Sequence, residues 1–200
     1  MALTQPDHGV LRKAQRGDER AFSLIVRAYE QPVYNYVLRL VGDRTLAEDL
    51  TQEVFLRVYQ GLPGFSDRSR FTTWLFQVTK NRVLDELRAL ERRPRAVVAL
   101  EDIPPLEVVD QPFERSETID AVWRAVEGLT VDLKMALLLR DVVGLSYSEI
   151  GDSLEITLAT VKWRIYKARE EVATALAREG ITVSTATTTR RATPAVAAVE

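Results

Sequence analysis

Aromatic and basic side chains follow one another between residues 65 and 95 of this 200-residue chain. The rings are those of Phe65, Phe71, Trp74 and Phe76. Residues 67–95 also carry eight basic and four acidic side chains. Rings that stack on bases, at about 1–3 kcal/mol each, and cations that neutralise phosphates suit single-stranded nucleic acid. The alternative is a helix core, which we expect for Leu75 and Val78 and least for Phe65, which lies in a Gly/Ser/Asp-containing loop.

A second candidate site lies near the carboxyl end of the chain. Ser146 and Glu149 form an S-x-x-E capping box at the start of a short helix. A turn at residues 155–157 and a longer helix over 158–178 follow it. This order is typical of a helix-turn-helix, whose second helix enters the major groove of duplex DNA.

The charge of the last helix agrees with that interpretation. Residues 115–156 have a net charge of −4, whereas residues 157–178 have a net charge of +3. At 100° per residue, Trp163, Tyr166 and Lys167 lie opposite the apolar stripe of the helix. The side chains on its flanks and around it are Thr160, Lys162, Arg164 and Arg169. The basic ones suit phosphate or guanine contacts, although a solvated basic helix end is the alternative.

A third feature is an acidic face on the helix that begins near Thr45. Asp49, Gln52, Glu53 and Arg57 recur there at helical spacing. The sequence alone leaves two explanations open. One is a solvated face that benefits from acidic residues near the helix N-terminus, and the other is a binding surface.

Helical periodicity extends over both halves of the chain, with no strand-like alternation of comparable length. We therefore predict an all-α fold. In the first half the expected helices cover 7–16, 22–40 with a kink at Pro32, 45–58 and 71–92. Thr45 and Glu48 predict a capping box for the third of these helices. In the second half, apolar residues at helical spacing predict helices over 119–129 and 133–139, before the helix-turn-helix.

The charge distribution divides the chain into two domains. Residues 1–95 have a net charge of +4, and residues 115–178 a net charge of −1. Between them, residues 96–114 carry five acidic side chains, no basic ones and three prolines, which predicts a flexible, extended linker. The Thr- and Ala-rich tail over 179–200 is expected to be disordered.

Several classes of function are disfavoured. The chain has no cysteine, which excludes disulfides and thiolate metal sites and suits a reducing cytoplasm. It has no apolar run of the roughly 20 residues that a membrane span needs. Its single histidine, His8, lies near the terminus, and neither a Gly-rich phosphate loop nor a serine elbow is present. We therefore expect neither an enzyme nor a cofactor. A free-standing dimeric helix-turn-helix regulator is the main alternative, but it gives no role to residues 71–93.

Five segments together resemble the extracytoplasmic-function (ECF) sigma factors of the sigma-seventy family. They are GDERAFSLIVRAY, AEDLTQEVFLRVYQ, FTTWLFQVTKNRVLDELR, LLLRDVVGLSYSEI and TVKWRIYKARE. Their order and spacing match the family over residues 7–178. The resemblance implies sigma domain two over 1–95, sigma domain four over 115–178, and a protein that binds core RNA polymerase and directs it to promoters.

The resemblance also implies a role for each candidate residue. Asp49, Gln52 and Glu53 would dock on the clamp coiled coil of the polymerase β′ subunit, and the β subunit would be a second contact. Unpaired bases of the −10 element would meet Phe65, Ser66, Asp67, Trp74, Lys80, Asn81 and Arg82. The −35 element would be read by Thr160, Lys162, Trp163, Arg164, Tyr166 and Lys167. An anti-sigma factor is an expected regulator.

Two residues depart from the family pattern. Glu155 occupies a turn position that is often glycine, so a positive φ there would strain the backbone. Trp163 replaces a common serine, and its ring could pack on a thymine methyl group or obstruct the usual fit. With a net charge of −2, we expect tight promoter binding only together with core polymerase.

Overall fold

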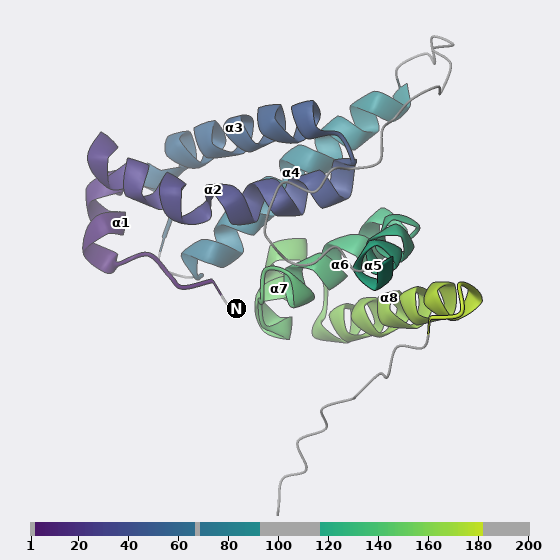
Figure 1. Ribbon diagram of the computed structural model, residues 1–200. Coiled ribbons are helices and arrows are strands. Elements are labelled where there is room, and N and C mark those ends of the chain that lie inside the picture. The colour runs from purple at the N-terminus through teal and green to yellow at the C-terminus, as the bar shows by residue number, and fades with distance from the viewer. Residues whose placement is uncertain (1–2, 67–68, 93–116, 182–200) are drawn as a thin grey trace, which may run out of the picture.

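The computed structural model describes residues 3–66, 69–92 and 117–181 of the chain. Within these ranges the regular structure consists of α-helices and one short 3-10 helix, without a β-strand (Figure 1). The predicted all-α fold is confirmed. The predicted linker over 96–114, and the tail from residue 182 onward, lie outside the described residues. Among the described helices, none is both long and apolar enough to cross a membrane.

The first four helices pack around one apolar core. They are α1 (His8–Gln15), α2 (Glu19–Val41), α3 (Arg44–Gly61) and α4 (Phe71–Arg92). Helix α2 continues through Pro32 and ends at Gly42, whose φ of 75° suits a left-handed helix cap. Tyr36 and Phe76 lie at the centre of this core with their rings edge to face, 5.4 Å apart.

The start of α3 differs from the prediction. Asp43, not Thr45, caps this helix, and its carboxylate accepts a hydrogen bond from the backbone N–H of Leu46 at 2.7 Å. The predicted capping box of Thr45 and Glu48 is therefore wrong. The physical reason is that Asp43 directly follows the helix-ending Gly42 and is as good a cap as threonine, so the helix begins two residues earlier.

The last four helices form a second packed unit. They are α5 (Glu117–Glu127), α6 (Val131–Asp141), α7 (Tyr147–Leu154) and α8 (Leu158–Arg178). Ser146 and Glu149 form the predicted capping box of α7. Glu155 then has φ 58° and ψ 43°, so the anticipated strained turn is present. Thr157 caps α8 with its side chain, and the helix-turn-helix is complete.

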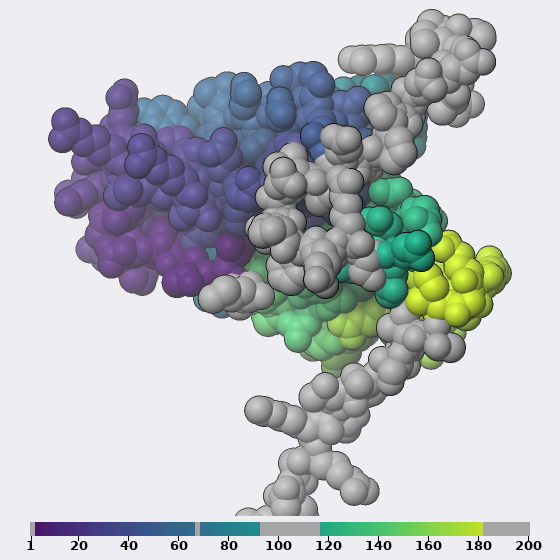
Figure 2. All heavy atoms as spheres, in the orientation of Figure 1, coloured from purple at the N-terminus to yellow at the C-terminus, as the bar shows by residue number. Residues whose placement is uncertain are grey.

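The two four-helix units contact each other directly. Helix α7 packs on α4, and α6 packs on α2. Figure 2 shows the second unit lying against one side of the first unit. Helix α3 is exposed on the opposite side of the first unit. The sequence predicted two modules separated by a linker but did not predict this contact.

Candidate nucleic-acid interface

The aromatic residues of the first candidate site form one cluster at the start of α4. The ring of Phe65 lies 5.0 Å from that of Trp74 and 6.0 Å from that of Phe71. Phe71 is buried and also contacts Tyr29, 5.4 Å away. Phe65 and Trp74 are half-buried, and thus present partly open ring surface on a rigid support.

The loop before α4 is tied to the rest of the first unit. The side-chain amide of Gln15 donates a hydrogen bond to the backbone carbonyl of Phe65 at 2.9 Å. Ser66 is exposed beside it. Asp67, a predicted base-pocket residue, lies outside the described residues. The structure therefore brings together Phe65, Ser66 and Trp74, but Asp67 cannot be placed with them.

The polar residues farther along α4 point in different directions. Asn81 is exposed. Lys80 is only 6% exposed, and its Nζ atom lies 2.5 Å from Oε2 of Glu155 in the helix-turn-helix. That hydrogen bond lowers the pKa of Glu155. A predicted DNA contact in the first unit is thus covered by the second.

Arg82 is buried between α3 and α4. Its guanidinium donates hydrogen bonds to the carboxylates of Glu53 and Glu86. The hydrogen bond from Arg82 lowers the pKa of Glu53 and raises the pKa of Arg82. Two residues that were predicted to meet different partners, Glu53 and Arg82, are therefore paired with each other.

The acidic face of α3 is exposed to solvent. Asp49, Gln52 and Glu53 line an open hollow together with Leu56. Leu56 is 57% exposed and adds an apolar side chain to this polar surface. The sequence analysis missed Leu56, although its position three residues after Glu53, on the same face of the helix, was a usable signal.

Helix α8 presents its aromatic residues to solvent. Trp163 and Tyr166 are 59% and 69% exposed. Lys162 is also exposed, and it forms no ion pair with any other residue in the described part of the chain. Residues three apart are neighbours on a helix surface, so the two rings form one exposed apolar patch, and such patches are typical of binding surfaces.

The other predicted residues of α8 form ion pairs or hydrogen bonds within the chain. Arg164 pairs with Asp132 at 2.8 Å, and its side chain is mostly covered. Lys167 pairs with Glu170 of its own helix at 2.7 Å. The Thr160 hydroxyl lies 2.8 Å from that of Thr157 at the helix start. The six predicted residues thus lie on one helix, and Arg164 is more enclosed than Lys167.

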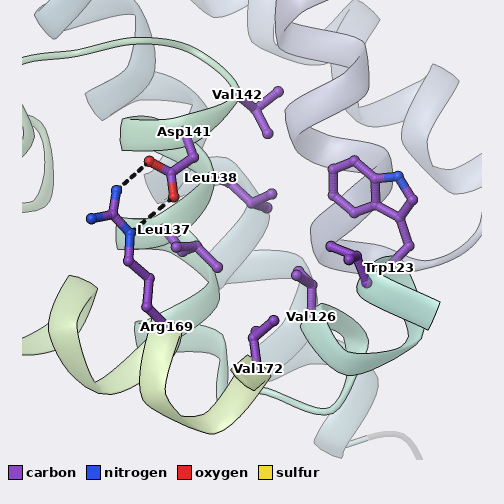
Figure 3. Close-up of a pocket in the computed structure, with 9 residues that line it drawn as sticks. Trp123, Val126, Leu137, Leu138, Asp141, Val142, Arg169 and Val172 are labelled. Carbon is purple, nitrogen blue, oxygen red and sulfur yellow. Dashed lines mark hydrogen bonds and ion pairs between the residues drawn. The ribbon is translucent and has the colours of Figure 1, made fainter. Parts of the chain in front are cut away.

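An apolar pocket of about 180 Å³ opens between α5, α6 and α8 (Figure 3). Its lining residues are Val122, Trp123, Val126, Leu137, Leu138, Asp141, Val142, Arg169 and Val172. At its edge, Arg169 is held by Asp141 through two hydrogen bonds. The sequence analysis missed this pocket because it is shared among three helices that periodicity treats separately.

Other kinds of site find no support in the described ranges. Across residues 3–66, 69–92 and 117–181, no group of three or more histidine or acidic side chains is placed to hold a metal ion. His8, at the start of α1, is exposed.

Comparisons with known proteins agree with the resemblance found in the sequence. Residues 25–93 match the family described as Sigma-70 region 2, and residues 119–172 match Sigma-70, region 4. The RNA polymerase sigma-H factor of Pseudomonas aeruginosa is 33% identical over 88% of this chain and 96% of its own length. The ECF RNA polymerase sigma-E factor of Escherichia coli K12 is 35% identical over 83% of this chain and 92% of its own.

Solved structures show the same fold. CnrH, solved in complex with the cytosolic domain of CnrY, has a TM-score of 0.66 at 21% identity and covers 87% of this chain and 99% of its own. The sigma factor RpoE from Bartonella quintana, in complex with the anti-sigma factor NepR, has the same TM-score and identity over 78% and 96%. The chain therefore belongs to the ECF sigma factors of the sigma-70 family, which are transcription initiation proteins and not enzymes.

Proposed function

We propose that this sigma factor binds core RNA polymerase through α3, captures unpaired bases of the −10 element beside α4, and contacts the −35 duplex with α8. The observation that carries the proposal is that one chain holds both a cluster of half-buried aromatic rings at the start of α4 and an exposed aromatic face on a helix-turn-helix. A dimeric repressor would need only the helix-turn-helix surface. In this proposal, sigma domain two is 1–95, the linker is 96–114, sigma domain four is 115–178 and the tail is 179–200.

Contacts to the melted −10 strand are assigned to the start and middle of α4. The residues are Phe65, Ser66, Asp67, Trp74, Lys80, Asn81 and Arg82. The half-buried rings of Phe65 and Trp74 support the assignment because they are fixed by packing yet partly open, as a stacking platform must be. Unpairing a few base steps costs several kcal/mol, which two or three such contacts offset.

Contacts to the −35 duplex are assigned to α8. The residues are Thr160, Lys162, Trp163, Arg164, Tyr166 and Lys167. The exposure of Trp163 and Tyr166 supports the assignment, because apolar rings on a recognition helix can pack on thymine methyl groups. Lys162 and Lys167 beside them suit phosphate contacts.

Contact with polymerase is assigned to Asp49, Gln52 and Glu53, which meet the β′ clamp coiled coil, and the β subunit is a second contact. The open hollow that these residues share with Leu56 supports the assignment, because it combines charge with an apolar centre. Catalysis and the remaining grip on DNA come from polymerase, so the sigma factor supplies binding alone.

An anti-sigma factor completes the proposed function. Two proteins of the same fold were solved with the cytosolic domain of CnrY and with the anti-sigma factor NepR. A protein that serves cytoplasmic polymerase also acts in the cytoplasm.

Run-off transcription with core polymerase on genomic fragments tests the proposal. Asn81→Ala should impair promoter opening, detected by permanganate reactivity of unpaired thymines, whereas Lys167→Ala should weaken duplex anchoring. Asn35→Ala and Lys13→Ala are matched controls, because both residues are exposed and lie outside the assigned surfaces. If both test variants transcribe like the wild type from every fragment, the assignments are wrong. Tight binding of an inverted repeat by a dimer without polymerase would favour the repressor.

A further inference from the structure

We propose that residues 3–15, called the N-terminal brace below, set the geometry of the aromatic −10 site, with Gln5 and Gln15 as positioning residues. The brace comprises the segment before α1 and α1 itself. It precedes residue 25, where the match to Sigma-70 region 2 begins. The proposal rests on the proposed function of α4, because the rings that the brace holds are those assigned to unpaired bases.

One end of the brace reaches the first turn of α4. The side-chain amide of Gln5 donates a hydrogen bond to the hydroxyl of Thr72 at 2.5 Å, and the backbone carbonyl of Thr4 accepts one from the hydroxyl of Tyr29. Leu3 packs against the apolar core beside them. Figure 1 shows this segment running past the start of α4. The segment before α1 is thus attached to both α2 and α4.

The two partners of this segment, Tyr29 and Thr72, adjoin the aromatic cluster. Both are buried, and the ring of Tyr29 lies 5.4 Å from that of Phe71, the residue before Thr72. Burial raises the pKa of Tyr29 to about 12, so its hydroxyl remains a hydrogen-bond donor at neutral pH. Phe71 in turn lies 6.0 Å from Phe65 and 5.9 Å from Trp74. A shift of the segment would therefore move the ring that both half-buried rings contact.

The other end of the brace holds the loop before α4. The side-chain amide of Gln15, the last residue of α1, donates a hydrogen bond to the backbone carbonyl of Phe65 at 2.9 Å. Helix α1 also packs on the 3-10 helix η1 (Leu62–Gly64), which directly precedes Phe65. Because this hydrogen bond engages the backbone of Phe65, it fixes the loop and leaves the ring half-buried and partly open.

A short, packed helix joins the two ends of the brace. The carboxylate of Asp7 caps α1 by accepting hydrogen bonds from the backbone N–H groups of Gly9 and Val10, at 2.7 and 3.2 Å. Leu11 and Ala14 are buried where α1 packs on α2. The cap fixes the junction between the segment and α1, so both glutamine contacts originate from one element that is anchored on α2.

The two glutamines hold the connection into α4 from both sides, because Phe65 precedes it and Thr72 follows it. A stacking site must keep its rings in place, and a loop that becomes ordered only on binding loses conformational entropy at that step. Hydrogen bonds from the brace supply this order before DNA binds. In this proposal neither glutamine touches DNA, so both act through the rings of Phe65, Phe71 and Trp74.

The test uses the complex of the full-length chain with core polymerase. Fluorescence anisotropy measures its affinity for a labelled single strand, copied from the melted region of a promoter found by run-off transcription. The variants are Gln5→Ala, Gln15→Ala and the double variant. Gln31→Ala is the matched control, because the amide of Gln31 also donates a side-chain hydrogen bond, to Asn35 at 2.8 Å, but on the exposed surface of α2.

The affinity for core polymerase is measured beside the affinity for the strand. A brace that only stabilised the first unit would change both affinities together, since its loss would lower the amount of folded protein. A brace that positions the rings changes the affinity for the strand alone. The two measurements therefore separate positioning from stability.

Each single variant should weaken strand binding about threefold and the double variant about tenfold, as expected for the loss of one and two hydrogen bonds. Gln31→Ala should bind the strand like the wild type. Thr72→Val should weaken binding as Gln5→Ala does, whereas Thr72→Ser, which keeps the hydroxyl, should bind severalfold more tightly than Thr72→Val. Wild-type strand binding in the double variant, an equal loss in Gln31→Ala or a parallel loss of affinity for polymerase overturns the proposal.

Trp74→Ala distinguishes failure of this proposal from failure of the proposed function. If Trp74→Ala weakens strand binding and the double glutamine variant does not, the brace has no positioning role and the assignment of α4 to the −10 strand stands. If Trp74→Ala binds the strand like the wild type, that assignment is contradicted, and the role of the brace is contradicted with it.

Discussion

Helices α4 and α8 carry the two proposed DNA contacts, yet the structure treats them in opposite ways. On α8, Trp163 and Tyr166 extend into solvent, and the helix packs only through its other side on α5, α6 and α7. On α4, Lys80 is buried beneath α7 and Arg82 is enclosed by Glu53 and Glu86. The difference is therefore one of exposure: the aromatic face of α8 is open, whereas two of the basic residues proposed for the −10 strand are engaged by carboxylates within the chain.

The sharpest contrast is between two aromatic rings. Phe71→Ala removes a fully packed ring at the start of α4 and should lower the free energy of unfolding by about 3–5 kcal/mol. Trp163→Ala removes an exposed ring and should change it by less than about 0.5 kcal/mol, while transcription from −35-dependent promoters falls. Urea denaturation measures both values. A large loss of stability in Trp163→Ala would show that its ring is structural.

The buried arginine of α4 provides the next comparison. Arg82→Ala leaves the carboxylates of Glu53 and Glu86 without this cation, so unfolding free energy should fall by about 1–3 kcal/mol. Arg88→Ala is the control, because Arg88 is 64% exposed and lies 3.8 Å from Asp85, and its loss should cost under about 0.5 kcal/mol. Equal, small effects on urea denaturation would mean that the ion pairs of Arg82 do not stabilise the fold.

Two variants of Glu155 distinguish the effect of backbone strain from the effect of the side chain. Glu155→Gly and Glu155→Gln both remove the ion pair with Lys80, but only glycine relieves the left-handed backbone. The glycine variant should therefore be more stable than the glutamine variant by about 1 kcal/mol in thermal unfolding. Both should open the interface between the units to the same extent. If the two units stay in contact in the glycine variant, the carboxylate of Glu155 does not hold them together.

The smallest expected effect is a dependence on pH of the contact between the two units at α4 and α7, which is called closure below. The hydrogen bond from Lys80 holds the pKa of Glu155 below its ordinary value of 4.5 in the closed form. For Glu149, burial acts to raise the pKa, but hydrogen bonds from Ser146 and the nearby Arg70 outweigh it and lower the pKa. Because closure favours the ionised carboxylates, it is fully present above pH 4.5 and is lost as pH falls through the lowered pKa values.

Because the chain has no cysteine, the exposed residues Glu30 and Arg178 can be changed to cysteine and labelled, and energy transfer between the labels would detect separation of the two units. Asp152→Asn, which changes an exposed carboxylate of α7, is the control and should show the same dependence of distance on pH as the wild type. The distance should stay constant from pH 8 to about pH 5 and lengthen below about pH 4.5. Opening that instead begins near neutral pH would assign closure to another group.

Local patterns in the sequence were enough to predict the helices, the capping box of α7 and the helix-turn-helix, because each depends on residues close together in the chain. The sequence misplaced the start of α3 by two residues, since Asp43 and Thr45 are both acceptable caps. The sequence also predicted backbone strain at Glu155, because this residue occupies a turn position that is often glycine.

Contacts between segments that are far apart in the chain could not be predicted from the sequence. The pairs Lys80–Glu155 and Arg82–Glu53 connect residues 75 and 29 positions apart, and no periodicity encodes such distances. Phe65, Phe71 and Trp74 illustrate the same limit. Sequence identified an aromatic group, but only packing showed that Phe71 is core while the rings of Phe65 and Trp74 stay partly open.

The most direct test of the account is site-specific photocrosslinking in a complex of this chain, core polymerase and promoter DNA. A photoreactive amino acid would replace Asn81 of α4 in one sample and Trp163 of α8 in another. The account predicts that position 81 crosslinks to the unpaired strand of the −10 element and position 163 to the duplex −35 element of the same DNA molecule. Crosslinks from both positions to one duplex segment, or crosslinks that form equally well without polymerase, would contradict it.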